Sequence, residues 1–299
     1  GLDNALWRTL ITSPDALRQR VALALSEICV ASVLGVDSSY RQFALAYYYD
    51  ILQTHAFGNY RQLLEDISLS PAMGYYLTYR GNSKANPKTG SQPDENYARE
   101  LMQLFTIGLV QFRADGTPVV NNGQFVETYR SDDVMGLARV FTGWDLDTAG
   151  LSKPYPAAQM CRPMAQVASR YETGAKQFLG TTIPEGTDAL AALRRALDVL
   201  FVHPNVAPFI SRQLIQRLVT SNPSGGYVAR VAAVFANNGQ GARGDLRAVV
   251  RAILLDPEAR DRGLFAETVA TGLDTNDRAR TEGAPEGFAK LVLGRRGRI

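Results

Sequence analysis

The amino-acid sequence predicts a mainly α-helical protein: a single multi-helix domain of the orthogonal type, with one small β-hairpin near residues 110–130. Three observations predict this fold class. In most segments, apolar residues recur at the three- and four-residue spacing of a helix face. Residues that start helices precede these segments, whereas turn dipeptides between short runs containing Val and Phe occur in one stretch. The 299 residues, 45% apolar and 20% charged, suffice for one large folded core.

The first third of the chain is predicted to be helical. Ser13-Pro14-Asp15 and Ser70-Pro71-Ala72 each place a hydroxyl before a proline, which is typical of a helix N-terminus because proline lacks an N–H that would have no partner there. An apolar face recurs every four residues between them: Phe43, Tyr47, Ile51 and His55. Gly58 offers a left-handed end to this helix, and a second helix is expected from Tyr60 to Leu69.

A long loop and a strongly patterned helix come next. Residues 81–93 have no periodicity and are rich in Gly, Pro, Asn and Ser, as loops are. Asp94 is expected to cap the following helix, which ends near Gly108. Its apolar residues at helical spacing are Tyr97, Leu101, Leu104 and Phe105.

The pattern then changes to that of a hairpin. Asp115-Gly116 and Asn122-Gly123 are turn dipeptides, so we expect a hairpin within residues 110–129. Ser131 is expected to cap the next helix, which ends at Gly143. The inward face of that helix is predicted to be Val134, Leu137 and Phe141.

The second half returns to helices after an irregular stretch. Residues 145–170 hold three prolines and no clear period. Helical patterns follow over residues 188–201, 205–220 and 227–236. A last helix from Gly244 should stop at Asp256-Pro257, because the residue before a proline resists the helical conformation. Beyond Arg260 the apolar pattern fades, so we expect a domain over 1–260 and a loosely packed tail over 261–299.

Composition argues against several function classes. A net charge of +3, from 32 basic and 29 acidic residues, predicts no nucleic-acid partner. Cys29, Cys161, His55 and His203 are too few and too scattered for a metal site, and no nucleotide-binding fingerprint predicts a cofactor. We expect His55 to be buried with one hydrogen-bond partner. The longest apolar stretch, 21–36, is shorter than the ~20 residues of a membrane span.

Several segments, in this order, resemble the domain of unknown function 1800 family. They are His55 to Arg61, Pro71-Ala72-Met73, Glu95 to Met102, Phe105 to Gly108, Asp133-Val134, Ala138-Arg139, Thr142-Gly143-Trp144, Thr173 to Lys176, Leu179-Gly180, His203-Pro204, and Arg212 with Arg217. The resemblance covers residues 15–258. It implies a bacterial, exported protein that works with a partner of sulfatase-like type, and it implies no activity. No signal peptide begins the sequence, so the exported location is implied by the resemblance alone.

Two departures from the family pattern bear on chemistry. Tyr171-Glu172 stands where the family has a His-Asp pair, and residues 22–27 stand where it has an aromatic and histidine-rich segment. Tyrosine and alanine cannot replace imidazole as a metal ligand or as a base near neutral pH. A histidine-based site of the family would therefore be lost in this chain.

The best polar cluster lies on the helix that Asp94 opens. Asn96, Glu100 and Gln103 fall at i, i+4 and i+7, with Arg99 beside them, so the four share one broad face. An arginine beside a carboxylate favours the ionised form, and a fixed amide can orient a ligand hydroxyl, so this face could bind or process a polar substrate. The alternative is a solvated face or a structural ion pair.

Residues elsewhere in the chain extend this cluster. Trp144 and Lys176 are further candidate binding residues. We expect Arg99 and Glu100 to be partly buried and to contact polar groups of residues 131–144 or 171–176, because the chain returns to this face through those segments.

Two functions fit these residues. The first is a noncatalytic binding or assembly partner of an envelope or secreted protein. The second is a carboxylate-dependent hydrolase acting on a glycan or other envelope polymer, with Glu100 and either Asp133 or Glu172 as catalytic acids. We favour the first, because the departures from the family pattern remove the most reactive side chains.

Overall fold

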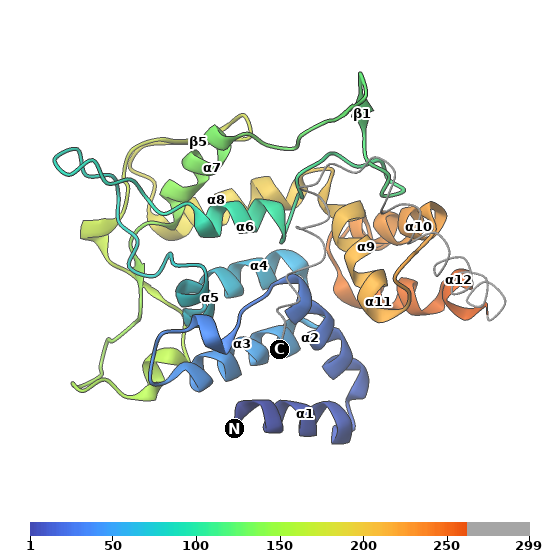
Figure 1. Cartoon of the computed structure of the whole chain (residues 1–299), viewed down its shortest axis with the longest axis horizontal. Helices are drawn as coiled ribbons and strands as arrows, with labels where there is room; N and C mark the ends of the chain where they lie inside the picture. Colours follow the sequence, from blue (N-terminus) through green and yellow to red (C-terminus); the bar gives the residue numbers. More distant parts are fainter. Residues whose placement is uncertain (262–299) are drawn as a thin grey trace, which may run out of the picture.

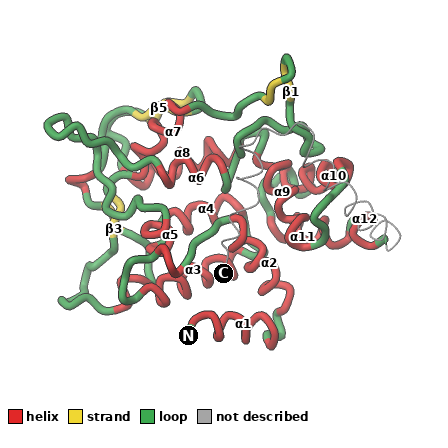
Figure 2. Tube along the Cα trace, viewed as in Figure 1, coloured by secondary structure: helices red, strands yellow, loops and turns green. Residues whose placement is uncertain are grey.

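Twelve α-helices make up most of the regular structure in residues 1–261, which are the residues that the computed structural model describes (Figures 1 and 2). The prediction of a mainly α fold is confirmed. The predicted loose tail over 261–299 lies outside the described residues, except for Asp261.

The helices and strands are as follows. The α-helices are α1 (Leu2–Thr12), α2 (Ala16–Ile28), α3 (Arg41–His55), α4 (Tyr60–Ser68), α5 (Pro71–Tyr76), α6 (Asn96–Gln103), α7 (Ser131–Ala138), α8 (Ala189–Val202), α9 (Val206–Leu218), α10 (Gly225–Ala236), α11 (Leu246–Leu255) and α12 (Pro257–Arg260). The antiparallel strand pairs are β1 (Val120–Asn121) with β2 (Gln124–Phe125), β3 (Trp144–Asp145) with β4 (Ala165–Gln166), and β5 (Lys176–Phe178) with β6 (Thr181–Ile183). Short 3-10 helices cover Val33–Gly35, Arg139–Phe141, Ala157–Met160 and Ala168–Arg170.

The predicted hairpin is present as β1 and β2. Asn122 and Gly123 form its turn with φ angles of 49° and 79°, the left-handed conformation that an Asn-Gly turn favours. The β5–β6 hairpin was not predicted. Its turn is Leu179-Gly180, and Leu179 has a φ of 47°, which a leucine rarely adopts. No turn dipeptide therefore marked this hairpin in the sequence.

An aromatic cluster fills the core beside α6. Tyr97 stacks on Tyr79 with ring centroids 4.2 Å apart, and Phe141 meets Tyr97 edge-on at 4.7 Å. The phenol groups are hydrogen-bonded: the Tyr97 Oη lies 2.6 Å from the Ser68 Oγ, and the Tyr79 Oη donates to the Ser68 carbonyl. Buried tyrosines of this kind add apolar area without leaving a polar group unsatisfied. Within residues 1–261, none of the helices has the length and apolar character to cross a bilayer.

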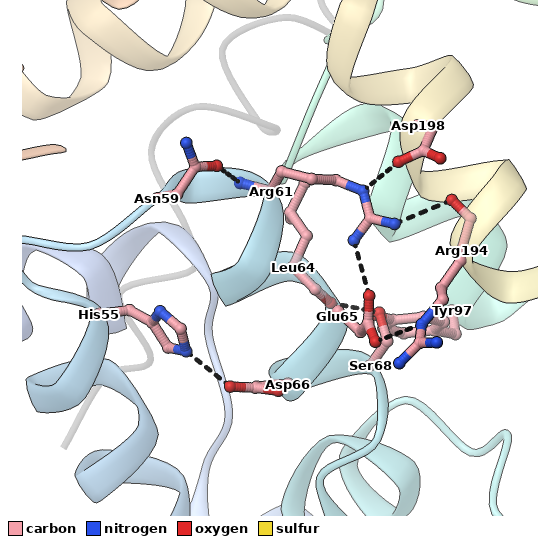
Figure 3. A network of polar contacts seen from close by, with 10 residues as sticks. All are labelled: His55, Asn59, Arg61, Leu64, Glu65, Asp66, Ser68, Tyr97, Arg194 and Asp198. Atoms are coloured by element: carbon pink, nitrogen blue, oxygen red, sulfur yellow. Dashed lines mark hydrogen bonds and ion pairs between the residues drawn. The ribbon is translucent and has the colours of Figure 1, made fainter. Parts of the chain in front are cut away.

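Ion pairs join α4 to α8 across 129 and 137 residues of sequence (Figure 3). Arg61 donates to the Asp198 carboxylate at 2.7 Å, to the Arg194 carbonyl at 2.9 Å and to Glu65 at 3.1 Å. Glu65 also accepts from Arg194 at 2.8 Å. The Arg61 side chain is 15% exposed, so these bonds satisfy a largely buried cation.

The predicted face of α3 is correct at Ile51 and His55, which are buried, and wrong at Phe43 and Tyr47. Phe43 is 51% exposed and Tyr47 is only partly buried. The buried residues are Ala44, Tyr48, Ile51, Leu52 and His55. A strict four-residue step rotates the face by ~40° per repeat, so the three steps from Phe43 to His55 rotate it by ~120°, which is more than the core-facing stripe covers. Leu104 lies one residue past the end of α6, so helical spacing no longer sets its direction, and it is exposed rather than buried.

His55 is buried as predicted, and its Nε2 lies 2.6 Å from an Asp66 carboxylate oxygen (Figure 3). The predicted left-handed conformation of Gly58 is wrong, because Gly58 does not have a positive φ angle. Helix α3 ends at His55, and Ala56 after it is in a right-handed conformation. A glycine fits position 58 for a steric reason instead, because a side chain there would come close to His55. A Cβ at this position would lie 3.1 Å from the His55 Nδ1.

The helix starts that were predicted lie within two residues of the observed ones, but the capping groups differ, and no start was predicted for α1, α3 or α12. Helix α5 begins at Pro71 as predicted, yet the Ser70 hydroxyl makes no capping bond. Helix α2 begins at Ala16, so Pro14 precedes it. Ser131 is the first residue of α7 rather than its cap, and the Arg130 backbone with Asp133 caps the helix.

Candidate functional site

Two surface grooves flank α7, which lies beside β5 (Figure 1). The first, which we call the loop groove, has a volume of about 550 Å³ and is lined by Ala85, Gln92, Pro93, Glu95, Asp132, Met135, Gly136, Arg139, Ala175 and Gln177. The second, the hairpin groove, has a volume of about 940 Å³ and is lined by Gln124 to Arg130, Asp132, Asp133, Leu179, Gly180 and His203. Asp132 lines both grooves, so they adjoin at the first turn of α7.

The wall between the grooves is held by α7 and the β5–β6 hairpin. Asp133 accepts a hydrogen bond from the Arg130 N–H at 2.8 Å and another from the Leu179 N–H at 2.6 Å. On the next turn, Gly136 lies against the Gln177 carbonyl so closely that a Cβ would be 1.7 Å from that oxygen. The backbone contact and the two bonds fix α7 on the hairpin, and with it the position of Asp132.

The loop groove offers polar groups that the protein leaves unpaired. Within residues 1–261, the side chains of Gln92, Asp132 and Gln177 have no hydrogen-bond or ion-pair partner. Arg139 donates to the Ala175 carbonyl at 3.2 Å and keeps a side-chain exposure of 40%. Two amides, a carboxylate and a guanidinium group therefore face the groove, which provides both donors and acceptors to a ligand.

Lys176 was predicted to bind a ligand, but its side chain is buried below the surface of the loop groove and has a structural role. Its side chain is fully buried, its Nζ donates to the Gly174 carbonyl at 3.0 Å, and it lies 4.7 Å from the centroid of the Tyr171 ring. Burial lowers the pKa of Lys176 below its ordinary value. A side chain in this position cannot touch a ligand and instead holds the 172–174 turn against β5.

Glu172 is likewise part of the support. Its carboxylate accepts from the Gly174 N–H at 2.9 Å and lies 3.4 Å from an Arg139 nitrogen. Burial acts to raise the pKa of Glu172, but the Gly174 N–H and Arg139 together hold it below its ordinary value. Glu172 stands at the position of the Asp in the family's His-Asp pair, and its lowered pKa makes it an ionised carboxylate rather than a proton donor.

Replacing Glu172 by glutamine is expected to make folding less sensitive to acid. Because the folded-state pKa is lowered, the carboxylate stabilises the fold above its ordinary pKa, and this contribution is lost as the pH falls through the folded-state value. Above the ordinary pKa the variant should lose about 1 kcal/mol of unfolding free energy. At low pH the two proteins should converge in urea titrations. A constant difference at every pH would contradict the assignment, and Glu185→Gln, at an exposed position, is the matched control.

The hairpin groove brings His203 near the first turn of α7. The His203 Nδ1 accepts from the Asn205 N–H at 3.2 Å, which leaves the Nε2 to carry the proton of the neutral ring. Burial first and then Arg243 lower the pKa of His203, so the neutral form is favoured. The Tyr129 Oη donates to the Gln103 amide oxygen at 3.5 Å, and burial is the main cause that raises its pKa to about 12. This groove therefore also presents neutral polar groups beside its acids.

The polar face predicted on α6 is partly buried, but its predicted partners are wrong. Arg99 pairs with Glu95 at 2.9 Å, four residues earlier, and not with residues 131–144 or 171–176. Among residues 1–261, Glu100 has no hydrogen-bond or ion-pair partner, and burial raises its pKa. Asn96 is exposed, and its amide donates to the Thr78 hydroxyl at 3.4 Å.

This face supports the grooves rather than lining them. Arg99 holds Glu95 of the loop groove, and Gln103 holds Tyr129 of the hairpin groove. Glu100 lines neither groove. Trp144 lines neither groove either and is 4% exposed, so it packs in the core and cannot meet a ligand there.

Sequence reasoning missed Gln92, Arg139 and Gln177 as groove residues. Gln92 lies in the loop whose length and composition gave a signal, since long loops often carry function. Gln177 alternates with the buried residues of β5, but the strand itself was not predicted. No metal is indicated, because no three His, Cys, Asp or Glu side chains of residues 1–261 converge as a metal-binding group.

Comparison with known proteins gives one finding. A family model described as "Protein of unknown function (DUF1800)" matches residues 1–273 of the chain. No curated protein and no solved structure matches it. The matched residues include both grooves.

Proposed function

Since the chain belongs to the DUF1800 family, whose function is unknown, we propose its function from its own residues: a noncatalytic binding protein that takes an extended polar ligand along the two grooves beside α7. One observation carries the proposal. Asp132 lines both grooves, and it has no partner among the described residues. A ligand held there can extend into either groove.

A glycan suits the lining of the loop groove. Sugar hydroxyls need acceptors and donors together, which the amides of Gln92 and Gln177 supply. Pro93 and Met135 add apolar surface between these polar groups, and Met135 is 48% exposed. Sugar rings have apolar C–H faces as well as hydroxyls, so this mixture supports a carbohydrate rather than a purely apolar ligand.

The side chains give less support to the alternative, a carboxylate-dependent hydrolase. Such enzymes place two carboxyl groups on opposite sides of one bond. Asp133 lines the hairpin groove, but its oxygens are occupied by two backbone N–H groups. Glu172 is paired with Arg139, and Glu100 lines neither groove. The three candidate acids therefore do not share one groove.

Our proposal places the protein outside the cytoplasm, at the bacterial envelope. The basis is the resemblance to the family, which implies export and a partner of sulfatase-like type. Assembly with such a partner is the second form of the binding role. It makes a different prediction, namely that the purified partner binds the chain while isolated glycans do not.

Substitution of Asp132 tests the proposal. Asp132→Ala and Gln177→Ala should each weaken binding of envelope glycan fragments by about tenfold in isothermal titration calorimetry. Each variant removes one hydrogen bond to the ligand and leaves the ligand's hydroxyl group without a partner. Long fragments should bind more tightly than monosaccharides, since only they reach both grooves. Glu185→Ala serves as the exposed control and should bind as the wild type does. Unchanged affinity in both groove variants would rule the grooves out.

A further inference from the structure

A third groove is lined mainly by residues of α1 and α3, the helices that Figure 1 labels, and it shares no residue with the grooves beside α7. Its volume is about 390 Å³, within the ~300–1,000 Å³ range of small-molecule sites. Helix α1 contributes Leu2 and Leu6, α3 contributes Leu45 and Tyr49, and the segment after α2 contributes Val33. Its walls are therefore mainly apolar.

The charges in this groove have one sign. Among the described residues 1–261, Asp3 and Asp50 are its only charged lining residues, and no lysine or arginine of this part of the chain lines it. Neither carboxylate has a hydrogen-bond or ion-pair partner in the part of the chain that the structure describes. Partial desolvation by neighbouring side chains raises the pKa of Asp50, although the residue stays exposed, as expected for a carboxylate at the edge of apolar walls without a compensating cation.

The neutral polar groups of the groove are mostly satisfied by the protein itself. Thr9 and Ser26 each donate to a carbonyl of their own helix, at 3.0 and 2.7 Å. The Gln53 amide oxygen accepts from the Gln19 amide at 2.8 Å. The two carboxylates are thus the strongest groups left for a ligand.

We propose that this α1–α3 groove binds a small amphipathic organic cation, an alkylammonium compound. Its apolar part would lie between the leucines of α1 and the side chains of α3, where transfer from water is favourable. Its ammonium group would meet Asp50 and Asp3, and the Tyr49 ring can add a cation–π contact. Complementarity of charge selects this ligand class, because an anion would face two uncompensated carboxylates. The proposal does not depend on the glycan-binding role.

Three six-carbon probes of different charge test this site on the whole chain: hexylammonium, 1-hexanol and hexanoate. Binding is followed by amide and methyl NMR shifts. Hexylammonium should bind saturably, with shifts at α1 and α3, and at least about tenfold more tightly than 1-hexanol. Hexanoate should show no saturable binding. Equal affinity for all three probes, or shifts of hexylammonium at other residues, would overturn the proposal.

Variants at Asp50 sharpen the test. Asp50→Asn should abolish the preference for hexylammonium over 1-hexanol, whereas Asp50→Glu should keep it. Asp50 is exposed, so both variants should melt within a degree or so of the wild type. Retention of the preference in Asp50→Asn contradicts the role of the carboxylate. Binding of a basic amphipathic peptide without binding of hexylammonium would contradict the small-cation assignment.

Discussion

Replacing Gly136 by alanine is expected to destabilise the protein by at least ~3 kcal/mol. The new Cβ would lie 1.7 Å from the Gln177 carbonyl oxygen and 2.8 Å from its carbon. Both are backbone atoms of β5, so no side-chain rotation relieves the overlap, and α7 must move away from the hairpin. That movement breaks the bond between the Leu179 N–H and Asp133 and displaces Asp132.

The change in unfolding free energy is measured by chemical denaturation. Gly226→Ala is the matched control, because Gly226 is also helical and its Cβ would meet only the flexible end of Arg230 at 3.2 Å and the Ser224 hydroxyl at 3.7 Å. That variant should be neutral or gain up to ~1 kcal/mol from the higher helix propensity of alanine. If Gly136→Ala costs no more than Gly226→Ala, the contact between α7 and β5 is wrong.

Replacing Asn205 by alanine should cost roughly 3 to 5 kcal/mol, because one buried side chain satisfies three backbone groups. Its Oδ1 accepts from the Phe112 N–H at 2.6 Å, and its Nδ2 donates to the carbonyls of Ile107 and Val110 at 2.5 and 2.8 Å. Asn205 is 3% exposed, so water cannot easily replace these bonds. The side chain joins the start of α9 to the segment that leads into the β1–β2 hairpin.

Hydrogen exchange locates the damage. In Asn205→Ala, amides of residues 107–112 should exchange faster, while those of α3 and α5, which pack on each other, should change little at low denaturant. Asn96→Ala is the control, since the exposed Asn96 makes one long bond, and it should cost less than ~1 kcal/mol. An equal loss of unfolding free energy in both variants would contradict the role of the three Asn205 hydrogen bonds in stabilising the fold.

Local rules predicted the helices well, because capping residues and apolar periodicity act within a few residues. They placed the starts of α6 and α7 to within one residue and the Asn122-Gly123 hairpin correctly, but α6 ends at Gln103 and α7 at Ala138, five residues before the predicted ends. They failed where the decisive contact comes from a distant segment. Leu179 adopts a left-handed conformation, and its N–H donates a hydrogen bond to Asp133, 46 residues earlier. The residues around Leu179 in the sequence do not indicate either feature.

In the candidate site, too, features set by nearby residues could be predicted, whereas features set by distant contacts could not. The partial burial of Arg99 follows from its place opposite the apolar face of α6, and it was predicted. Its partner Glu95 was available at i−4 spacing, but a tertiary partner was expected instead. Residues such as Gln177 line a groove only because β5 packs on α7, so sequence spacing could not select them.

Titration of the wild-type protein with envelope glycan fragments tests the central claim most directly. Amide NMR shifts report the binding site, and chromatography of the recovered fragments reports cleavage. We expect saturable shifts at residues 92–95, 124–133 and 175–180, with the glycan recovered intact. Shortened fragments would contradict the noncatalytic role, and the absence of saturable shifts at these residues would contradict glycan binding in the grooves beside α7.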